Sequence, residues 1–354
     1  MNKPNILFIC TDQQTADSII DPELLGQLPN IAFLRDNGVT FTKAVCCTPQ
    51  CTASRGGILT GLYPHRTGVV TNIGAGCGNT DFPEGIDLHP RYKNAGEYFR
   101  DAGYETAYFG KWHLGESAWA QGFDRYFCDE GLAATEEVFE EYHPGKGTVD
   151  PVTTRLCCEY IKEKHEKPFI LFSELINPHD CYSVPGNNPF GDELYPEVEL
   201  EPHDDFDLRK NNGSHPLKTP FMEEDQGAQY NERPDIDWKR YRAFYRYMLR
   251  RVDAQVGEML DALREKDLLK DTMVILTSDH GDLETAHRMI YKGPFMYREL
   301  VDIPLVVAFP DQGFQPRTSN ALINNIDLLP TVAEYAGLNI QSQMDGKSFK
   351  AVID

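Results

Sequence analysis

The sequence predicts an α/β domain built around a largely parallel sheet. Short apolar runs, each long enough for one buried strand, recur along the chain and alternate with helical patterns, as βαβ architecture requires. The runs are NILFIC, ETAYFG, PFILFSEL, TMVILTSD and IPLVVAF. With 354 residues, 41% hydrophobic content and 11% aromatic residues, the chain is long enough for one large domain or two medium ones with a packed core.

The first predicted strand, at residues 5–10, leads directly into polar residues. NILFIC is followed by Thr11, Asp12 and Gln13, and the run MVILTS at residues 273–278 is followed by Asp279 and His280. Ligands collect beyond the carboxyl ends of strands in open α/β sheets, so we expect both ends to share one site. The two carboxylates, the amide and the imidazole would offer three oxygens and one nitrogen to a divalent cation. A turn capped by an aspartate is the simpler alternative for each strand end.

A cysteine-rich segment at residues 46–65, CCTPQCTASRGGILTGLYPH, contains a second signal. Cys51 precedes a sequence typical of the first turn of a helix, with Thr52 or Ser54 available for capping. At the positive end of the helix dipole, with Arg55 one turn on, a thiol would have a lowered pKa and the turn would bind anions. A buried, inert thiol is the alternative.

Two other interpretations of this segment have little support. Cys47 and Cys51 are not followed by a second cysteine pair or by histidines at zinc-finger spacing, which argues against a structural zinc site. The chain has nine cysteines, an odd number, and opens on a strand-like run without a secretion signal. We therefore expect reduced thiols rather than a disulfide framework, and a cytoplasmic location.

A long helix and a long polar stretch follow later in the chain. Residues 238–264 form the clearest helical pattern, with apolar residues at three- and four-residue spacing. These residues are Tyr241, Phe244, Tyr245, Met248, Leu249, Val252, Val256, Met259, Leu260 and Leu263. Residues 181–237 are rich in prolines, glycines and acidic clusters. Stretches of that length inside a compact domain are often functional, so we expect a polar insert or lid, with a partly ordered surface insert as the alternative.

The charge of the chain limits its partners. The formal net charge is −21 at pH 7. Non-specific binding to nucleic acid or to an anionic membrane needs a basic face, so we expect neither partner. A small anionic substrate stays compatible with this charge if the cations gather in one pocket.

Several motifs, taken together, resemble one family. The segment CTPQCTASRGGILTGLYPHRTG resembles the signature of the sulfatase family, within the alkaline-phosphatase superfamily: a C-x-[PA]-x-R core followed by Leu-Thr-Gly-x-x-Pro. Further elements resemble this family in the same order: PNILFICTDQQ, YFGKWHLG, INPHD, LTSDHGD, YKGPFMYRELVDIPLVV, NIDLLPTVAEYAGL and DGKSF. The resemblance covers almost the entire chain. It implies a mixed, largely parallel central sheet flanked by helices and a single catalytic domain over residues 1–354.

The resemblance also implies a modified residue and a metal. In sulfatases the cysteine at the position of Cys51 is converted to formylglycine. By the same resemblance, Asp12, Gln13, Cys51, Asp279 and His280 would hold one divalent metal. Calcium is the expected ion because the ligands are rich in oxygen, and manganese or magnesium would tolerate the same set.

The same resemblance assigns catalytic roles. Hydrated formylglycine at Cys51 would attack sulfur and form a covalent sulfate ester, and its second hydroxyl would then expel sulfate. His113 and Arg55 would hold the gem-diol, with His113 as the base of the second step.

Four further side chains would contact the substrate. Lys111 and Lys292 would bind sulfonate oxygens, and His179 would donate a proton to the departing alcohol. His287 is a candidate for substrate contact, evenly balanced against a surface role. As isolated residues, the two lysines would be taken for solvated side chains and the histidines for ordinary loop residues.

The chain departs from the common family pattern at two places. Gln13 stands where typical members have a second aspartate, as in the branch that includes choline sulfatases and phosphonate monoester hydrolases. The chain stops at Asp354, so we expect most of the family's small C-terminal antiparallel domain to be absent. Ala53 gives the C-x-A-x-R variant, which resembles the substrates of radical-SAM maturing enzymes of the cytosol.

The sequence therefore predicts a sulfatase, a sulfuric ester hydrolase of the EC 3.1.6 type. A small anionic sulfate ester would be its substrate and a radical-SAM maturing enzyme would act on Cys51. One alternative is a phosphonate monoester or phosphodiester hydrolase of the same superfamily, and another is a non-catalytic metal- or anion-binding remnant. Self-association into a homo-oligomer is open, because an exposed sheet edge or apolar face would favour it.

Overall fold

A computed structural model gives the architecture of the chain. It describes residues 3–72, 88–89, 91–115, 122–129, 149–183, 235–293, 295–340 and 343–354. The predicted insert at residues 181–237 lies outside the described residues except at its two ends. Among the described residues, no helix combines the length and apolar character needed to cross a bilayer.

Eight strands form the central sheet. Their order across the sheet is β5 (Arg125–Asp129), β4 (Glu105–Lys111), β6 (Phe169–Pro178), β1 (Asn5–Asp12), β7 (Thr272–Ser278), β8 (Leu305–Ala308), β2 (Gly38–Phe41) and β9 (Arg317–Ser319). Pairing is parallel from β5 through β7, and β8 pairs in the antiparallel sense with both of its neighbours. A small second sheet pairs β3 (Ala44–Val45) with β10 (Ile323–Asn324). The predicted largely parallel sheet is confirmed.

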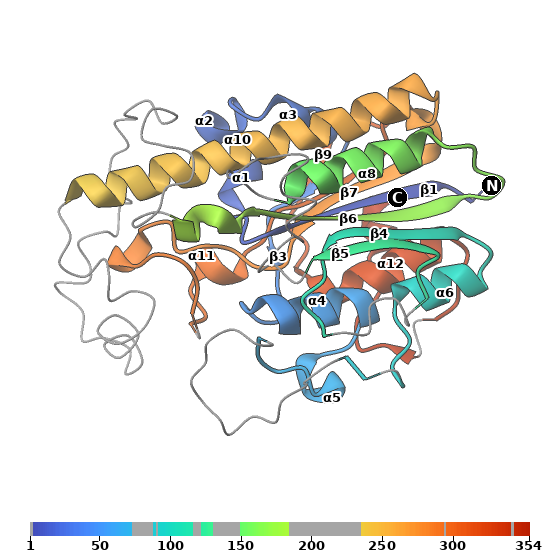
Figure 1. The fold of residues 1–354 in the computed structure, drawn as a ribbon, viewed down its shortest axis with the longest axis horizontal. Coiled ribbons are helices and arrows are strands. Elements are labelled where there is room, and N and C mark those ends of the chain that lie inside the picture. The colour runs from blue at the N-terminus through green and yellow to red at the C-terminus, as the bar shows by residue number, and fades with distance from the viewer. Residues whose placement is uncertain are drawn as a thin grey trace.

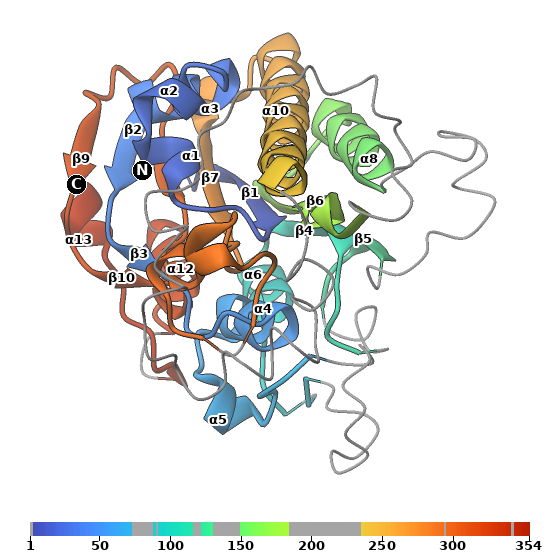
Figure 2. The same cartoon turned by 90° about the vertical axis from the view of Figure 1, so that its left-hand side faces the viewer.

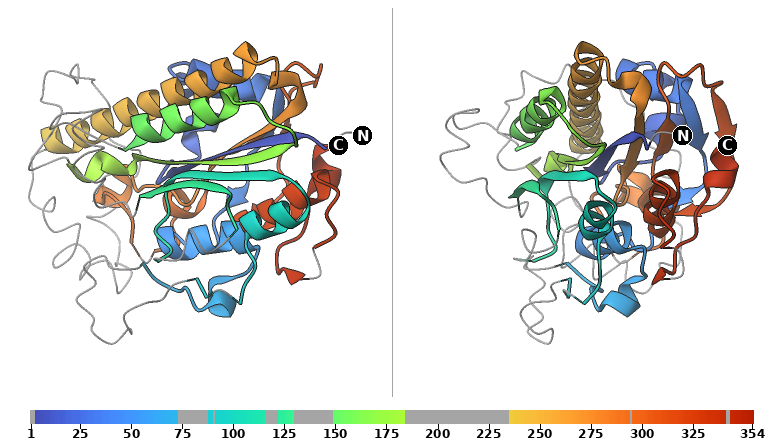
Figure 3. Two further views of the ribbon diagram at one scale, coloured as in Figure 1. Left: turned by 45° about the vertical axis from the view of Figure 1, so that its right-hand side comes forward. Right: turned by 90° about the vertical axis from the view of Figure 1, so that its right-hand side faces the viewer.

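Helices cover both faces of this sheet (Figures 1 and 3). One layer contains α1 (Asp17–Ile20), α2 (Pro22–Leu25), α3 (Pro29–Asp36), α8 (Asp150–Lys162) and α10 (Asp235–Glu265). The other contains α4 (Cys51–Thr60), α6 (Ala95–Asp101), α12 (Leu328–Tyr335) and α13 (Lys350–Ile353). The short helices α5 (Pro64–Thr67) and α11 (Arg298–Val301) lie in loops beyond these layers.

The two faces of the sheet belong to two apolar clusters. On β1, Leu7 and Ile9 pack with the layer of α8 and α10, whereas Ile6 and Phe8 pack with the layer of α4 and α6. Side chains alternate between the faces of a strand, so a strand buried on both sides must be apolar at nearly every position. This is why the strands appear in the sequence as continuous apolar runs.

The long helix α10 confirms the prediction for residues 238–264. It spans Asp235–Glu265, and each of the ten residues of its predicted apolar stripe is completely buried. The stripe packs on α3, α8 and β6. Figure 2 shows α10 and α8 together above the sheet, on the side opposite α4.

Gly110, at the carboxyl end of β4, allows a close approach of two strands. Its φ is 113°, and a Cβ atom there would lie 2.0 Å from the backbone oxygen of Glu174 on β6. We expect Gly110→Ala to lower the free energy of unfolding by more than the ~1–3 kcal/mol that an unfavourable φ alone costs. Gly103, with a φ of 83° and open space around it, is the matched control. Urea unfolding of both variants checks this, and equal losses would contradict the steric argument.

Candidate active site

Five elements bring polar side chains together beyond the carboxyl ends of the strands. Asp12 ends β1, Lys111 ends β4, His179 follows β6, and Asp279 with His280 follows β7. The helix α4 begins at Cys51 on the same side of the sheet. Ligand atoms of Asp12, Cys51, Asp279 and His280 lie within 4.8 Å of one another, and all four residues are buried. The two strand ends therefore share one site, as the sequence predicts.

Cys51 is surrounded by charged groups. Its Sγ lies 2.8 Å from Lys292 Nζ, 3.3 Å from His280 Nε2, 3.7 Å from Asp12 Oδ1 and 4.0 Å from Lys111 Nζ. Burial is the largest single influence on the pKa of the thiol and raises it, as Asp12 does. The combined charges of Lys111, Lys292 and His280 outweigh both and hold the pKa well below its usual value. The charges around Cys51 therefore favour the thiolate form.

The start of α4 differs in one detail from the prediction. Gln50 occupies the N-cap position and its side chain makes no capping hydrogen bond, so neither Thr52 nor Ser54 caps the helix. The hydroxyl of Ser54 instead donates to the backbone oxygen of Asp279 at 2.5 Å and accepts from Asn325 Nδ2 at 2.7 Å. These bonds fasten the first turn of α4 to the loop after β7.

Arg55 links β1, β6 and the loop after β7 through carboxylates. Its Nε lies 2.9 Å from Asp279 Oδ2, and its two terminal nitrogens lie 2.7 Å from Glu174 Oε2 and 3.4 Å from Asp12 Oδ2. One terminal nitrogen also donates to the backbone oxygen of Lys111 at 3.1 Å. Through these bonds Arg55 orients the carboxylates around Cys51. The resemblance implies a different role, in which Arg55 contacts the modified cysteine directly.

Both candidate lysines are buried in the site, which excludes the alternative that they are solvated surface residues. Lys111 Nζ lies 2.5 Å from Asp12 Oδ2. Lys292 Nζ donates to Cys51 Sγ and, at 3.1 Å, to Gln13 Oε1. Gln13 adopts a left-handed backbone conformation, with a φ of 73°, and turns its side-chain oxygen toward Lys292. Two cations thus stand beside Cys51 in a chain of high negative charge.

The histidines occupy different places. His179 is partly buried at the start of a 3-10 turn, and burial together with the charges of Lys111 and Lys292 holds its pKa well below the usual value, despite Asp12 and Cys51. His113 is buried two residues after β4, with a φ of 53°. The ring of His287 stacks on that of Tyr297, with the ring centroids 4.2 Å apart, and its Nε2 lies 3.5 Å from Glu299 Oε2. Its contact with substrate stays a prediction.

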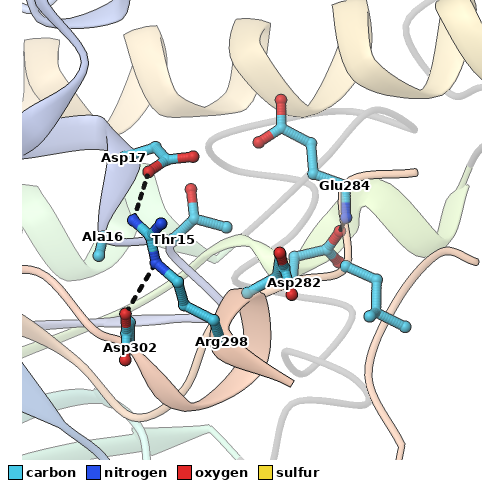
Figure 4. Close-up of a pocket in the computed structure, with 9 residues that line it drawn as sticks. Thr15, Ala16, Asp17, Asp282, Glu284, Arg298 and Asp302 are labelled. Atoms are coloured by element: carbon cyan, nitrogen blue, oxygen red, sulfur yellow. Dashed lines mark hydrogen bonds and ion pairs between the residues drawn. The ribbon is translucent and has the colours of Figure 1, made fainter. Parts of the chain in front are cut away.

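A cavity of about 50 Å³ lies beside Asp282, three residues after Asp279. Figure 4 shows that Arg298 bridges Asp17 and Asp302 in its wall, and Glu284 also lines it. Carboxylates outnumber cations here, so this cavity does not suit an anion. Among the described residues, the place beside Cys51 that Lys111 and Lys292 both approach suits an anionic group better.

Comparison with known proteins decides the family. The model of the family described as Sulfatase matches residues 4–338. The chain belongs to the sulfatase family. This family consists of sulfuric ester hydrolases with an alkaline-phosphatase-like fold, so the resemblance found from the motifs is confirmed.

The relatives of the chain include sulfatases of moderate similarity. The uncharacterized sulfatase YidJ of Escherichia coli strain K12 is 28% identical over an alignment 383 residues long, gaps included. This alignment covers 99% of this chain and 71% of that protein. Arylsulfatase K of Mus musculus is 27% identical over 369 residues, which cover 99% of this chain and 64% of that protein. The chain thus spans about two thirds of the length of these relatives.

Solved structures share the fold. A 2-O GAG sulfatase aligns with a TM-score of 0.77 and 24% identity, covering 99% of this chain and 74% of its own. The phosphonate monoester hydrolase of Agrobacterium radiobacter aligns with a TM-score of 0.74 and 21% identity, covering 99% of this chain and 77% of its own. Similarity at this level of identity concerns the architecture alone.

Three residues around the site were not found from the sequence. Glu174 is the one acidic residue of the buried and mainly apolar strand β6, and an acidic residue in such a run was the signal available. Asp282 follows the Asp-His-Gly loop and accepts hydrogen bonds from Gln13 and Tyr241. Tyr241 was predicted as core alone; it is buried and also donates to this carboxylate. The eight described cysteines are all free thiols, as expected, and Cys77 lies outside the described residues.

The pH dependence of stability should report on Glu174. Burial raises the pKa of Glu174 from 4.5 to about 7, against the lowering effect of Arg55. The folded state therefore binds this proton more tightly than the unfolded chain, so the contribution is complete at low pH and is lost as the pH rises through about 7. We expect Glu174→Gln to flatten the fall in the free energy of unfolding between about pH 4.5 and pH 7. Urea unfolding across this range with a chelator present checks this; a variant with the wild-type slope would contradict it.

Proposed function

We propose that this chain hydrolyses sulfate monoesters and releases inorganic sulfate and an alcohol, using a formylglycine formed from Cys51 and one divalent metal. The observation that carries the proposal is the position of Cys51. It opens a buried helix, its Sγ contacts Lys292 and His280, and it belongs to a compact group of metal-ligand atoms. A poor electrophile such as a sulfate ester needs a strong nucleophile and cations at the same point.

The residues present fit a divalent metal. Asp12 and Asp279 are both completely buried and close together, and burial followed by the charge of Asp12 raises the pKa of Asp279. A divalent cation would remove this repulsion, and carboxylate oxygens with one imidazole suit calcium, with manganese and magnesium compatible. Asp12, Asp279, His280, the group at position 51 and the oxygen of Gln13 would hold it. When bound, the metal supplies Lewis-acid polarisation and lowers the pKa of a hydroxyl group beside it.

The buried lysines would bind the sulfonate group. Lys111, from the end of β4, and Lys292, from the loop before α11, both approach the Cys51 side chain, and both are almost completely shielded from water. Two ammonium groups in such a place stabilise the oxygens of a sulfate ester far more than solvated lysines do. Both lysines also form ion pairs with the carboxylate of Asp12.

Proton transfer is assigned to the histidines. The charges of Lys111, Lys292 and Cys51 all act on the pKa of His179, which supports a place for this histidine near the leaving alcohol. The negative charge of a bound sulfate ester would raise the pKa of His179 and make it a proton donor. His113 would take the proton that is released when sulfate departs. Arg55 would act through Asp12 and Asp279, whose positions it holds.

Maturation of Cys51 is part of this proposal. The C-x-A-x-R pattern around Ala53 supports a radical-SAM type of maturing enzyme and, with it, a cytoplasmic location. The substrates named for two similar proteins, a hexuronate 2-O-sulfate in a Bacteroides thetaiotaomicron relative and a 6-O-sulfated glucosamine in a solved structure, support a sulfated sugar.

Phosphonate monoester or phosphodiester hydrolysis is the second candidate. Gln13 replaces a second aspartate and lowers the negative charge of the ligand set, and phosphonate monoester hydrolases share the fold. Parallel rates on an aryl sulfate, a phosphonate monoester and a phosphodiester distinguish the two candidates, and the faster ester identifies the activity.

Conversion of Cys51 can be measured directly. In protein made with a competent maturation system, we expect the tryptic peptide that contains Cys51 to be about 18 Da lighter, because a sulfur and two hydrogens leave and one oxygen enters. We expect Cys51→Ala to lower kcat by at least about 10³-fold, as removal of a nucleophile does. An unmodified thiol in fully active protein, or an active alanine variant, would refute the covalent mechanism.

Metal removal gives a separate test. We expect a chelator to abolish turnover of the matured protein and added calcium, manganese or magnesium to restore it, because Asp12 and Asp279 need a cation between them. Elemental analysis must accompany the assay. Turnover that persists after verified metal loss would rule out the metal.

A further inference from the structure

The side chain of Gln13 could present either its oxygen or its amino group to the candidate metal site. Its neighbours decide which. Nε2 lies 2.6 Å from Asp282 Oδ2, and Oε1 lies 3.1 Å from Lys292 Nζ. An ammonium group can only donate a hydrogen bond, and an ionised carboxylate can only accept one. A single orientation of the amide satisfies both neighbours, and it directs the oxygen toward Lys292, which itself contacts Cys51.

Asp282 is held in place from three sides. It is completely buried, its Oδ2 accepts from the hydroxyl of Tyr241 at 2.8 Å, and its Oδ1 accepts from the backbone nitrogen of Glu284 at 2.6 Å. Tyr241 comes from α10 and also accepts from the backbone nitrogen of Tyr291, next to Lys292, at 3.3 Å. One hydrogen-bond network therefore joins the loop after β1, the loop after β7, the helix α10 and the segment that contains Tyr291 and Lys292.

We propose that Asp282 is a positioning residue, which fixes the Gln13 amide so that its oxygen serves as an uncharged ligand of the metal, with Tyr241 as its anchor. This inference rests on the metal site of the proposed function. Gln13, Tyr241 and the backbone of Glu284 donate to Asp282 at 2.6 to 2.8 Å, and the thiol of Cys181 donates to it at 3.9 Å, so its two oxygens accept from four donors. An asparagine at position 282 would offer one oxygen, and its amino group would face another donor. The Gln13 amino group would then keep only the weak contact with Cys181 Sγ at 3.6 Å, or would turn to the metal.

The pairing also explains why an amide, and not a carboxylate, suits position 13. A carboxylate there would lie beside the carboxylate of Asp282, and two like charges in a buried site repel strongly. The partners can be exchanged. In the double variant Gln13→Glu with Asp282→Asn, the new amide at position 282 would donate to the new carboxylate at position 13, which would still direct an oxygen to the metal.

The test compares the calcium affinity of the wild-type chain with that of Asp282→Asn, Gln13→Glu and the double variant, by isothermal titration with Ca²⁺. We expect Asp282→Asn to weaken calcium binding by roughly 10- to 100-fold, the usual effect of losing a partner behind a metal ligand. We expect the double variant to bind at least about tenfold more tightly than Asp282→Asn alone. Glu284→Gln is the matched control: its carboxylate pairs with Arg242 and Arg246, so it removes a nearby charge without touching the Gln13 bond.

Several results would overturn the inference. The inference is overturned if Asp282→Asn binds calcium as tightly as the wild-type chain. It is also overturned if the double variant binds calcium no better than the product of the two single effects predicts. A loss of calcium affinity in Glu284→Gln equal to that in Asp282→Asn would overturn it as well. If Asp282→Asn does not fold, Tyr241→Phe replaces it, with an expected loss of roughly three- to tenfold, and an unchanged affinity overturns the anchoring role. Wild-type protein that binds no calcium, manganese or magnesium would instead refute the metal site itself, whatever the variants do.

Discussion

The site depends on one buried cation, the guanidinium of Arg55. It pairs with carboxylates that come from β1, from β6 and from the loop after β7, and all of these groups are shielded from water. A buried charge that loses its partner costs about 3–5 kcal/mol, so none of these groups is free to move on its own. Because Arg55 is one turn along α4 from Cys51, the same pairing fixes where α4 begins relative to the strands. The position of Cys51 among the ligand atoms follows from that.

The balance of charge in the site contrasts with that of the whole chain. The protein carries a formal charge of −21, yet Arg55, Lys111 and Lys292 converge within a few ångströms of Asp12 and Cys51. The charge of the chain was compatible with an anionic substrate only if cations gathered in one pocket. The fold brings them together from α4, from the end of β4 and from the loop before α11. The acidic excess lies elsewhere, for example in the wall of the cavity beside Asp282.

Patterns that act over short distances were read correctly from the sequence. The stripe of α10 and the apolar strands follow from local periodicity. The family motifs pointed to Cys51, Arg55 and both lysines, which the fold brings together, and their catalytic roles stay predictions. Glu174 could not be found in this way, because its role needs β6 to lie beside β1 and its register to place it opposite Cys10. Ser54 was predicted as a possible cap of α4. Its hydroxyl instead donates to the backbone oxygen of Asp279, which is more than two hundred residues away along the chain. The bond between Gln13 and Asp282 was hidden for the same reason.

The burial of α4 has a consequence for the order of events in the cell. All ten residues of this helix are buried, and Cys51 is only 1% exposed. An enzyme that must enclose a cysteine in its own active site cannot reach one that already lies beneath the sheet. Conversion of Cys51, as proposed, therefore has to come before α4 packs into place, and it competes with folding for the same chain. Slower folding, as at a lower growth temperature, would then leave more time for modification, so the yield of mature protein is set by the relative rates of two processes rather than by either one alone.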